Sequence, residues 1–355
     1  MKKIIFVILI LFSASFVSAQ TAQQKPLTQA EYVKMLYDVQ KNPVKKDELI
    51  EAVRRRGIAF ELTDGLRSLT TSKSRSDVDL RRTLEEAARR KENPTGAKLP
   101  SEKEALEILS KTREATLTAV EEMPDFVVKQ QIARSAAFAG TNNFRSLDRL
   151  VVAVSYRASG QEDYKILSRN GILEASPKSK QSYEEVGGTS STGEFVTVLA
   201  KIFKPDSDTK FELVDSDVIR TRRALVFDYA VERDKAKQVI IAAGAFDDTA
   251  ITGMKGRVWI DRENFRVLRV ESQATEIPDG FRVRAASRTI DYDWVTIADE
   301  KYLLPTVSDV RLTSKEDRQM FETRNVIRFK EYQKYGSEVK ILDDDEEVPE
   351  VKPNQ

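Results

Sequence analysis

The chain offers few residues of the types that perform catalytic chemistry. It contains no histidine and no cysteine among its 355 residues, so it lacks the usual general base near neutral pH, the thiol nucleophile and the commonest zinc ligands. These absences exclude serine–histidine triads, cysteine–histidine pairs and HExxH metal sites. Carboxylate catalysis, serine–lysine catalysis, an oxygen-ligated metal and a non-enzymatic role remain open.

Asp291 and Asp293 are one candidate pair of carboxylates. They stand two residues apart on a predicted strand and therefore lie on one face of it, where such a pair could act as acid and base on a sugar. The second carboxylate of a glycosidase normally comes from another element. We therefore expect a solvent-facing pair on a sheet that is wetted on one side.

The remaining motifs favour no chemistry either. Ser207 and Ser337 each stand three residues before a lysine, but the SDN and KTG companions of serine–lysine enzymes are absent, and neither serine opens a predicted helix. The acidic run at 343–347 lacks the EF-hand spacing for calcium. We therefore expect no catalytic residue, no metal and no cofactor, and we interpret the protein as non-enzymatic.

Residues 1–19 are typical of a secretory signal peptide. A basic start, Lys2 and Lys3, precedes an apolar run to Phe12, and small residues lead to a cleavage site near Ala19-Gln20. The apolar run is too short to persist as a membrane span. We therefore expect an exported, periplasmic protein, whose lack of cysteine leaves packing alone to hold the fold.

The charge balance points to no polyanionic partner. The 58 Lys and Arg residues nearly equal the 57 Asp and Glu residues, and the two signs are interspersed along the chain. Such a chain has no net electrostatic field that would attract nucleic acid or an anionic membrane. We expect neither as a partner.

Residues 27–92 predict a small all-α module. Thr28 and Glu31 have the spacing of a capping box at the start of the first helix, and Gly57 ends a second helix. A last helix follows, and residues 93–100, with a proline and a glycine, form a linker. This module is a possible docking surface for an envelope protein.

Between residues 101 and 340 the helical spacing gives way to alternation. A helix opened by Ser101 ends before Pro124, and apolar residues then alternate with polar ones, with 255–271 as the clearest hairpin. We count roughly ten strands joined by short polar turns, so we expect an antiparallel sheet that curls or closes. Residues 341–355 form an acidic tail, which we expect to be disordered.

One helix interrupts the strands, at residues 194–203 after the Gly/Ser-rich stretch 187–193. Its apolar residues lie on a single face. The helix could be a lid over an apolar cavity, with the glycines before it as hinges, or a plug that completes the core. Trp259 points away from its strand neighbours and could face a ligand or simply pack. The candidate apolar lining of a ligand site is Phe195, Val198, Leu199, Ile202, Phe203 and Trp259.

The order of these elements resembles a known family. The stretch 121–126 leads from the helix into the sheet, and 258–271, 302–305 and 324–329 read VWIDRENFRVLRVE, YLLP and RNVIRF. Over residues 101–340 the chain resembles exported bacterial proteins related to the lipoprotein-localisation carriers of the periplasm, the LolA/LolB-like superfamily. The resemblance implies an α+β fold, a curved antiparallel half-open β-barrel with plugging helices, here preceded by the small all-α module. It also implies a cavity for acyl chains, and it assigns no contact residue.

Three functional hypotheses follow. The first is a periplasmic, non-enzymatic carrier or chaperone for a lipid or an acylated ligand, because a concave apolar sheet suits an acyl chain. The second is a structural or adaptor protein of the envelope, whose barrel is filled and whose residues 27–92 dock a partner. The third is a carboxylate hydrolase. Co-purified lipid would favour the first.

Overall fold

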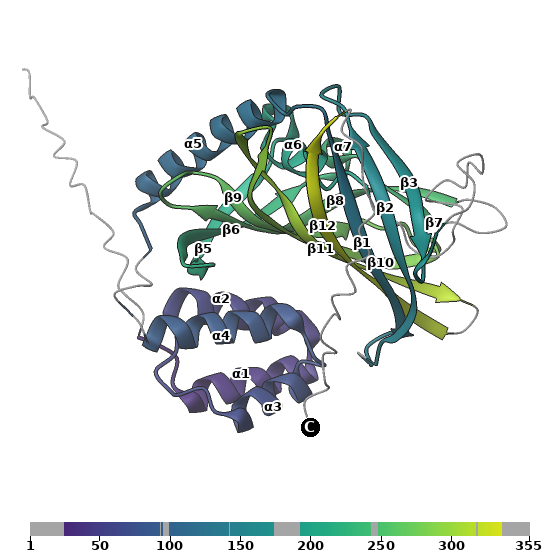
Figure 1. The fold of residues 1–355 in the computed structure, drawn as a ribbon. Coiled ribbons are helices and arrows are strands. Elements are labelled where there is room, and N and C mark those ends of the chain that lie inside the picture. Colours follow the sequence, from purple (N-terminus) through teal and green to yellow (C-terminus); the bar gives the residue numbers. More distant parts are fainter. Residues whose placement is uncertain are drawn as a thin grey trace, which may run out of the picture. The chain divides into compact units, whose positions relative to one another are not determined.

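The computed structural model describes residues 25–92, 94, 99–141, 143–173, 192–242, 248–316 and 319–335. The predicted signal peptide, the acidic tail, most of the linker and most of the stretch 187–193 lie outside these residues. The chain divides into two compact units, Met1–Ala97 and Lys98–Gln355. Figure 1 labels the elements of both units.

The first unit consists of helices around its own apolar core. The predicted capping box is present, since the Glu31 N–H donates to the Thr28 hydroxyl at 3.3 Å and the Thr28 N–H donates to the Glu31 carboxylate at 2.8 Å. Gly57 ends the second helix with a φ of 69°, which favours glycine. The helices are α1 Gln29–Lys41, α2 Lys46–Arg56, α3 Asp64–Lys73 and α4 Val78–Glu92, with a 3-10 turn at Pro43–Lys45.

The sequence pattern does not predict α3. This helix buries only Leu66 and Thr70, so its apolar stripe is too thin to stand out from a loop. Its position depends instead on tertiary contacts. Leu66 belongs to the core that Leu36, Leu49 and Leu80 contribute from the other helices.

The second unit is an antiparallel sheet of twelve strands with helices packed on it. Its strands are β1 Phe126–Phe138, β2 Arg145–Tyr156, β3 Glu162–Arg169, β4 Ile172–Leu173, β5 Lys210–Ile219, β6 Arg222–Val231, β7 Gln238–Ala242, β8 Asp248–Asp261, β9 Val267–Thr275, β10 Val283–Ile297, β11 Glu300–Glu316 and β12 Gln319–Lys334. Its helices are α5 Glu102–Glu121, α6 Thr197–Phe203 and α7 Arg233–Ala236, with a 3-10 turn at Pro205–Ser207.

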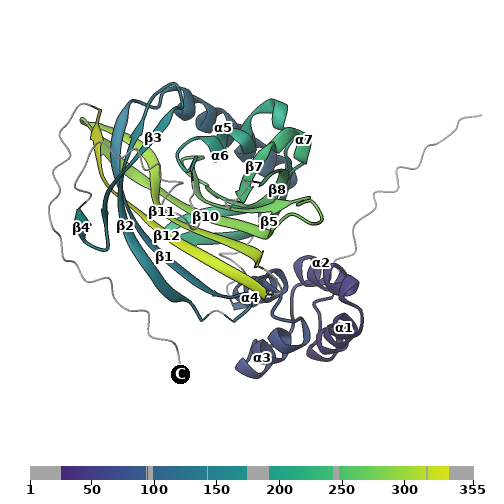
Figure 2. The same cartoon turned by 90° about the vertical axis from the view of Figure 1, so that its right-hand side faces the viewer.

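The expected fold class is confirmed: the sheet is antiparallel, curved and open. The strand order is β4-β3-β2-β1-β12-β11-β10-β9-β8-β6-β5, with β7 paired to β8. The strands wrap around α6, and α5 lies on the same side (Figure 2). We call this side the concave face and the other side the convex face. The count of roughly ten strands was low because β4 and β7 are short.

The alternation of the sequence separates the two faces. Val258 and Ile260 of β8 pack with α6 on the concave face, whereas Trp259 between them packs in another cluster with Leu268 and Val226. Successive side chains of a strand point to opposite faces. The sheet is therefore buried on both sides along β6, β8 and β9, which explains the long apolar runs in these strands.

The predicted helix 194–203 is shorter than expected. It begins at Thr197, and residues 194–196 form a turn. Val196 precedes the helix with a φ of −120° and no side-chain cap, so nothing local favours an earlier start. Residues 194–196 are held by contacts with the sheet.

Candidate functional site

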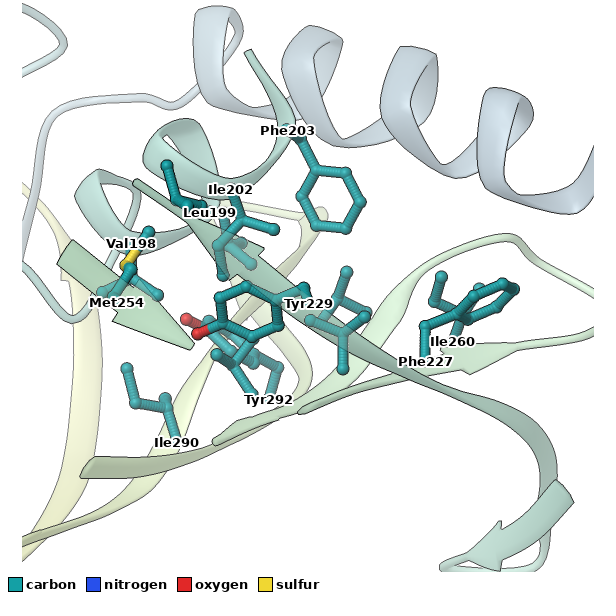
Figure 3. Packing of buried hydrophobic residues seen from close by; sticks show 14 of the residues in the cluster. Val198, Leu199, Ile202, Phe203, Phe227, Tyr229, Met254, Ile260, Ile290 and Tyr292 are labelled. Atoms are coloured by element: carbon teal, nitrogen blue, oxygen red, sulfur yellow. The ribbon is translucent and has the colours of Figure 1, made fainter. Parts of the chain in front are cut away.

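The concave face carries a continuous apolar surface under α6. Val198, Leu199, Ile202 and Phe203 all point from the helix to the sheet and are buried. Figure 3 shows them above Phe227 and Tyr229 of β6, Ile260 of β8, and Ile290 and Tyr292 of β10. Ala105 and Ile108 of α5 complete this cluster. The helix face predicted from the sequence is thus the one that meets the sheet.

Phe195 packs in a second cluster of the concave face, toward β1 and β2. Its ring lies 5.2 Å from that of Phe126, 5.8 Å from Tyr156 and 5.6 Å from Phe329, measured between centroids. Phe195 is 1% exposed. We call residues 192–203 the plug segment, since its apolar side chains cover the concave face from β1 to β6.

Hydrogen bonds hold the first residues of the plug segment to two strands. The Glu162 carboxylate of β3 accepts the N–H of Gly193 at 3.1 Å. Arg288 of β10 donates to the Thr192 carbonyl oxygen at 3.0 Å, and its guanidinium lies 3.8 Å from the buried Glu194 carboxylate. These contacts fix the start of the plug segment to β3 and β10.

The tyrosine hydroxyl next to this network is buried. Tyr292 donates to the Glu194 carbonyl oxygen at 3.2 Å. Burial raises the pKa of Tyr292 well above its ordinary value, so this phenol stays a neutral donor. Burial also raises the pKa of Glu162, against the hydrogen bonds that Tyr164 and Gly193 donate to it. Both shifts reflect the low polarity of the concave face.

The far end of the plug segment is held by side-chain hydrogen bonds to backbone carbonyl oxygens. The Ile202 carbonyl oxygen accepts from the Thr209 hydroxyl at 2.7 Å and from the Ser207 hydroxyl at 3.3 Å. Lys201 donates to the Lys237 carbonyl oxygen at 3.3 Å. Ser207 therefore caps α6, while the lysine of its S-x-x-K match, Lys210, pairs with Glu232 at 2.9 Å. Serine and lysine do not meet, and the second match lies outside the described residues.

Trp259 does not share the surface of the other candidate lining residues. Its indole N–H donates to Asp217 at 3.0 Å, and Arg269 lies over its ring at 5.7 Å. It packs with Leu268 in a cluster of the convex face. The structure therefore brings four of the six predicted lining residues together in one cluster and places Phe195 in a second cluster of the concave face. It places the tryptophan on the opposite side of the sheet.

Asp291 and Asp293 are also engaged by arginines. Arg269 binds Asp291 through two hydrogen bonds of 2.6 and 3.0 Å, and Arg220 lies 3.4 Å from Asp293 and 4.0 Å from Asp291. Both carboxylates thus take part in an ion-pair network across β9 and β10. Among the described residues, no three side chains of metal-binding type form a cluster.

Buried polar groups on the concave face are the feature that sequence reasoning missed. Gln130 of β1 and Ser308 of β11 are fully buried, and neither side chain has a hydrogen-bond partner among the residues that the structure describes. Arg134 pairs with Asp148 through two bonds of 2.6 Å, and Arg169 lies 2.9 Å from the same carboxylate. The concave face is therefore apolar under α6 and polar toward one end.

A sequence signal for these groups exists. Gln130 interrupts the apolar row that Phe126, Val128 and Ile132 form on one face of β1. A polar residue at a core position of an alternating strand marks either a network or a ligand contact. The interrupted row is visible in the sequence, but the spacing alone does not distinguish a network from a ligand contact.

Comparisons with known proteins identify no family. No protein-family model matches the sequence, and no curated protein matches it. In the part of the chain that the structure describes, no helix has both the length and the hydrophobicity to cross a bilayer.

Similar solved structures exist at low similarity. One is a DUF1329 family protein from Desulfovibrio piger, with 9% identity and a TM-score of 0.28, covering 65% of this chain and 95% of that chain. Another is the MucA/MucB complex of Pseudomonas aeruginosa, with 9% identity and a TM-score of 0.17, covering 62% of this chain and 94% of that chain. At such low TM-scores neither likeness assigns a ligand, a partner or a family.

Proposed function

We propose that this chain is an exported, non-enzymatic carrier of the periplasm that binds the apolar chain of a lipid or an acylated protein on its concave face. The resemblance to the LolA/LolB-like superfamily is part of the same proposal. The observation that carries it is the apolar surface under the plug segment, which consists of two core clusters in a sheet that is open and curved. Such a surface suits an acyl chain once the plug segment moves aside.

The plug segment and an acyl chain would gain comparable transfer free energies from burial on the concave face. The plug segment buries six large apolar side chains, Phe195, Val196, Val198, Leu199, Ile202 and Phe203, which is worth about 9–18 kcal/mol of transfer free energy. An acyl chain of about 15 methylenes contributes about 12 kcal/mol by the same rule. Exchange of the plug segment for an acyl chain is therefore close to balanced, as a carrier that must also release its ligand requires.

Direct binding tests this proposal. The purified full chain, analysed by native mass spectrometry, is expected to carry co-extracted lipid. After delipidation it is expected to take up a palmitoyl-chain fluorophore saturably, at one site per chain, and unlabelled acyl chains should displace the probe. Bare polypeptide together with no saturable uptake would refute the carrier role.

The two tryptophans allow the site to be located. In one variant, Trp294→Phe leaves Trp259 as the only reporter, on the convex face. In a second variant, Trp259→Phe and Trp294→Phe remove both native reporters, and Phe227→Trp places one on the concave face of β6. A brominated acyl chain should quench the second reporter and spare the first. Equal quenching of both would contradict binding at the concave face.

A second function is favoured by the extent of packing. In the described residues, the side chains of the concave face and of the plug segment pack into two core clusters, and the first unit has a core of its own. An envelope adaptor requires no ligand cavity. These packed cores suffice for an adaptor that docks its partner through residues 27–92. Deleting residues 27–92 from the full chain should then abolish partner capture, whereas a carrier keeps its acyl uptake.

A further inference from the structure

The fully buried polar side chains of the concave face point to a ligand group. The side-chain oxygen and nitrogen of Gln130 and the hydroxyl of Ser308 have no hydrogen-bond partner among the described residues, and both residues are 0% exposed. Leaving a buried amide unpaired is unfavourable, so native proteins seldom keep one without a water or a ligand to satisfy it.

The sheet register places the two residues on either side of one strand. Gln130 pairs with Phe329 of β12, and Ser308 pairs with Ile327, two residues away on the same face. Phe329 lies under Phe195 of the plug segment, and Ser308 also pairs with Ile290 under α6. Both polar groups therefore border the apolar surface that the plug segment covers.

The neighbouring charges are already committed. Arg134, four residues beyond Gln130 on the same face, forms a two-bond pair with Asp148. Arg288, two residues before Ile290, binds the plug segment. The site thus presents an amide donor, an amide acceptor and a hydroxyl, while these two nearby cations of the described chain are paired elsewhere. Such a set matches a neutral carbonyl or hydroxyl and would leave a carboxylate anion unbalanced in an apolar surrounding.

We propose that Gln130 binds the ester or amide carbonyl of a neutral acyl ligand and that Ser308 binds a second polar group of the same ligand. The hydrocarbon chain takes the place of residues 195–203 of the plug segment, while Thr192 and Glu194 keep their contacts with Arg288. This inference rests on the proposed carrier function and specifies its ligand: an acyl ester or acyl amide, in preference to a free fatty acid. The Gln130 amide N–H donates to the carbonyl oxygen, and its own oxygen accepts from a hydroxyl or N–H of the ligand.

Competition between matched ligands tests the inference. Monopalmitoylglycerol and palmitate carry the same chain, and each is titrated against the palmitoyl-chain fluorophore bound to the delipidated full chain, at a pH where palmitate is ionised. The ester is expected to compete about tenfold or more better than the acid, the difference that one or two well-placed hydrogen bonds supply.

Variants of two adjacent glutamines provide the control. Gln130→Leu is expected to weaken ester binding about tenfold and to change palmitate binding little. Gln131→Leu makes the same substitution at the next residue, which is exposed on the other face of β1, and should change neither. Gln130→Met, which is close in shape, should repeat the result of Gln130→Leu.

The outcomes separate this inference from the carrier role. If neither ligand binds, the carrier function fails. If both bind equally and Gln130→Leu changes neither, the carrier function stands, and the buried amide is satisfied by water alone. If Gln130→Leu weakens both ligands equally, the residue shapes the cavity and selects no carbonyl. Each of the last two results overturns the inference.

Discussion

Truncating Phe195 to alanine is expected to weaken the fold and to strengthen acyl binding at the same time. The ring is almost fully buried and contacts three other aromatic rings. Phe→Ala substitutions at such sites cost about 3–5 kcal/mol. Because Phe195 lies in the plug segment, the substitution removes this energy from the closed form and leaves the open form nearly unchanged.

The effect on affinity follows from the population of the open form. A loss of about 3 kcal/mol raises the open fraction more than a hundredfold, and the apparent affinity rises in proportion while the open form remains the minor one. Part of this gain is offset, because the truncated side chain would contact a bound acyl chain less than the phenyl ring does. The net expectation is roughly 10- to 100-fold tighter binding of the palmitoyl-chain fluorophore, together with a lower urea midpoint.

Phe281→Ala is the matched control. Phe281 is 5% exposed and packs in a separate cluster with Ile240 and Val283, away from the plug segment. Its truncation should lower the urea midpoint to a similar degree and leave the affinity for the fluorophore unchanged. If Phe195→Ala weakens the binding or leaves it unchanged, the segment is a fixed part of the core and the reasoning is wrong.

Three further predictions concern stability. Gly256→Ala would drive a methyl group into the Glu271 carbonyl oxygen and should cost more than about 4 kcal/mol in urea unfolding, whereas Gly65→Ala, with its nearest atom at 3.8 Å, should be nearly neutral. Asp148→Asn removes the charge of the carboxylate that binds buried Arg134 and should lower the free energy of unfolding by about 3–5 kcal/mol, which urea unfolding curves of both proteins will measure. Because burial raises the pKa of Glu162, its favourable contribution is complete below the unfolded pKa of 4.5 and is lost as the pH rises through the higher folded pKa. Glu162→Gln should therefore remove this loss and flatten the pH dependence of the urea midpoint above pH 4.5, and an unchanged profile would contradict this assignment.

Local signals predicted the local structure well. The Thr28 capping box and the Gly57 helix end depend on residues within one turn of each other, and both are present. The alternation in β2 and β8 predicted strands and faces for the same reason. Where a helix depends on tertiary contacts, as α3 does, its sequence carried too weak a stripe to be recognised.

The candidate site was only half predictable. The apolar face of α6 is a property of one segment, and the sequence contains it entirely. Gln130 and Ser308 come to flank one strand only through β12, whose Phe329 pairs with Gln130 and whose Ile327 pairs with Ser308. The spacing of residues along the chain does not predict that β12 pairs with both β1 and β11. Trp259 was grouped with α6 because one strand alone does not tell which face meets which helix.

The open edges of the sheet have a mechanical consequence. In the described residues β4 and β5 end the sheet at its two sides without pairing with each other. The diameter of a closed barrel is fixed by its strand number and stagger. This open sheet can change its curvature slightly while every inter-strand hydrogen bond stays intact. In the proposed carrier, ligands of different thickness would then be accommodated by a change of twist spread over many strands, with no hydrogen bond broken.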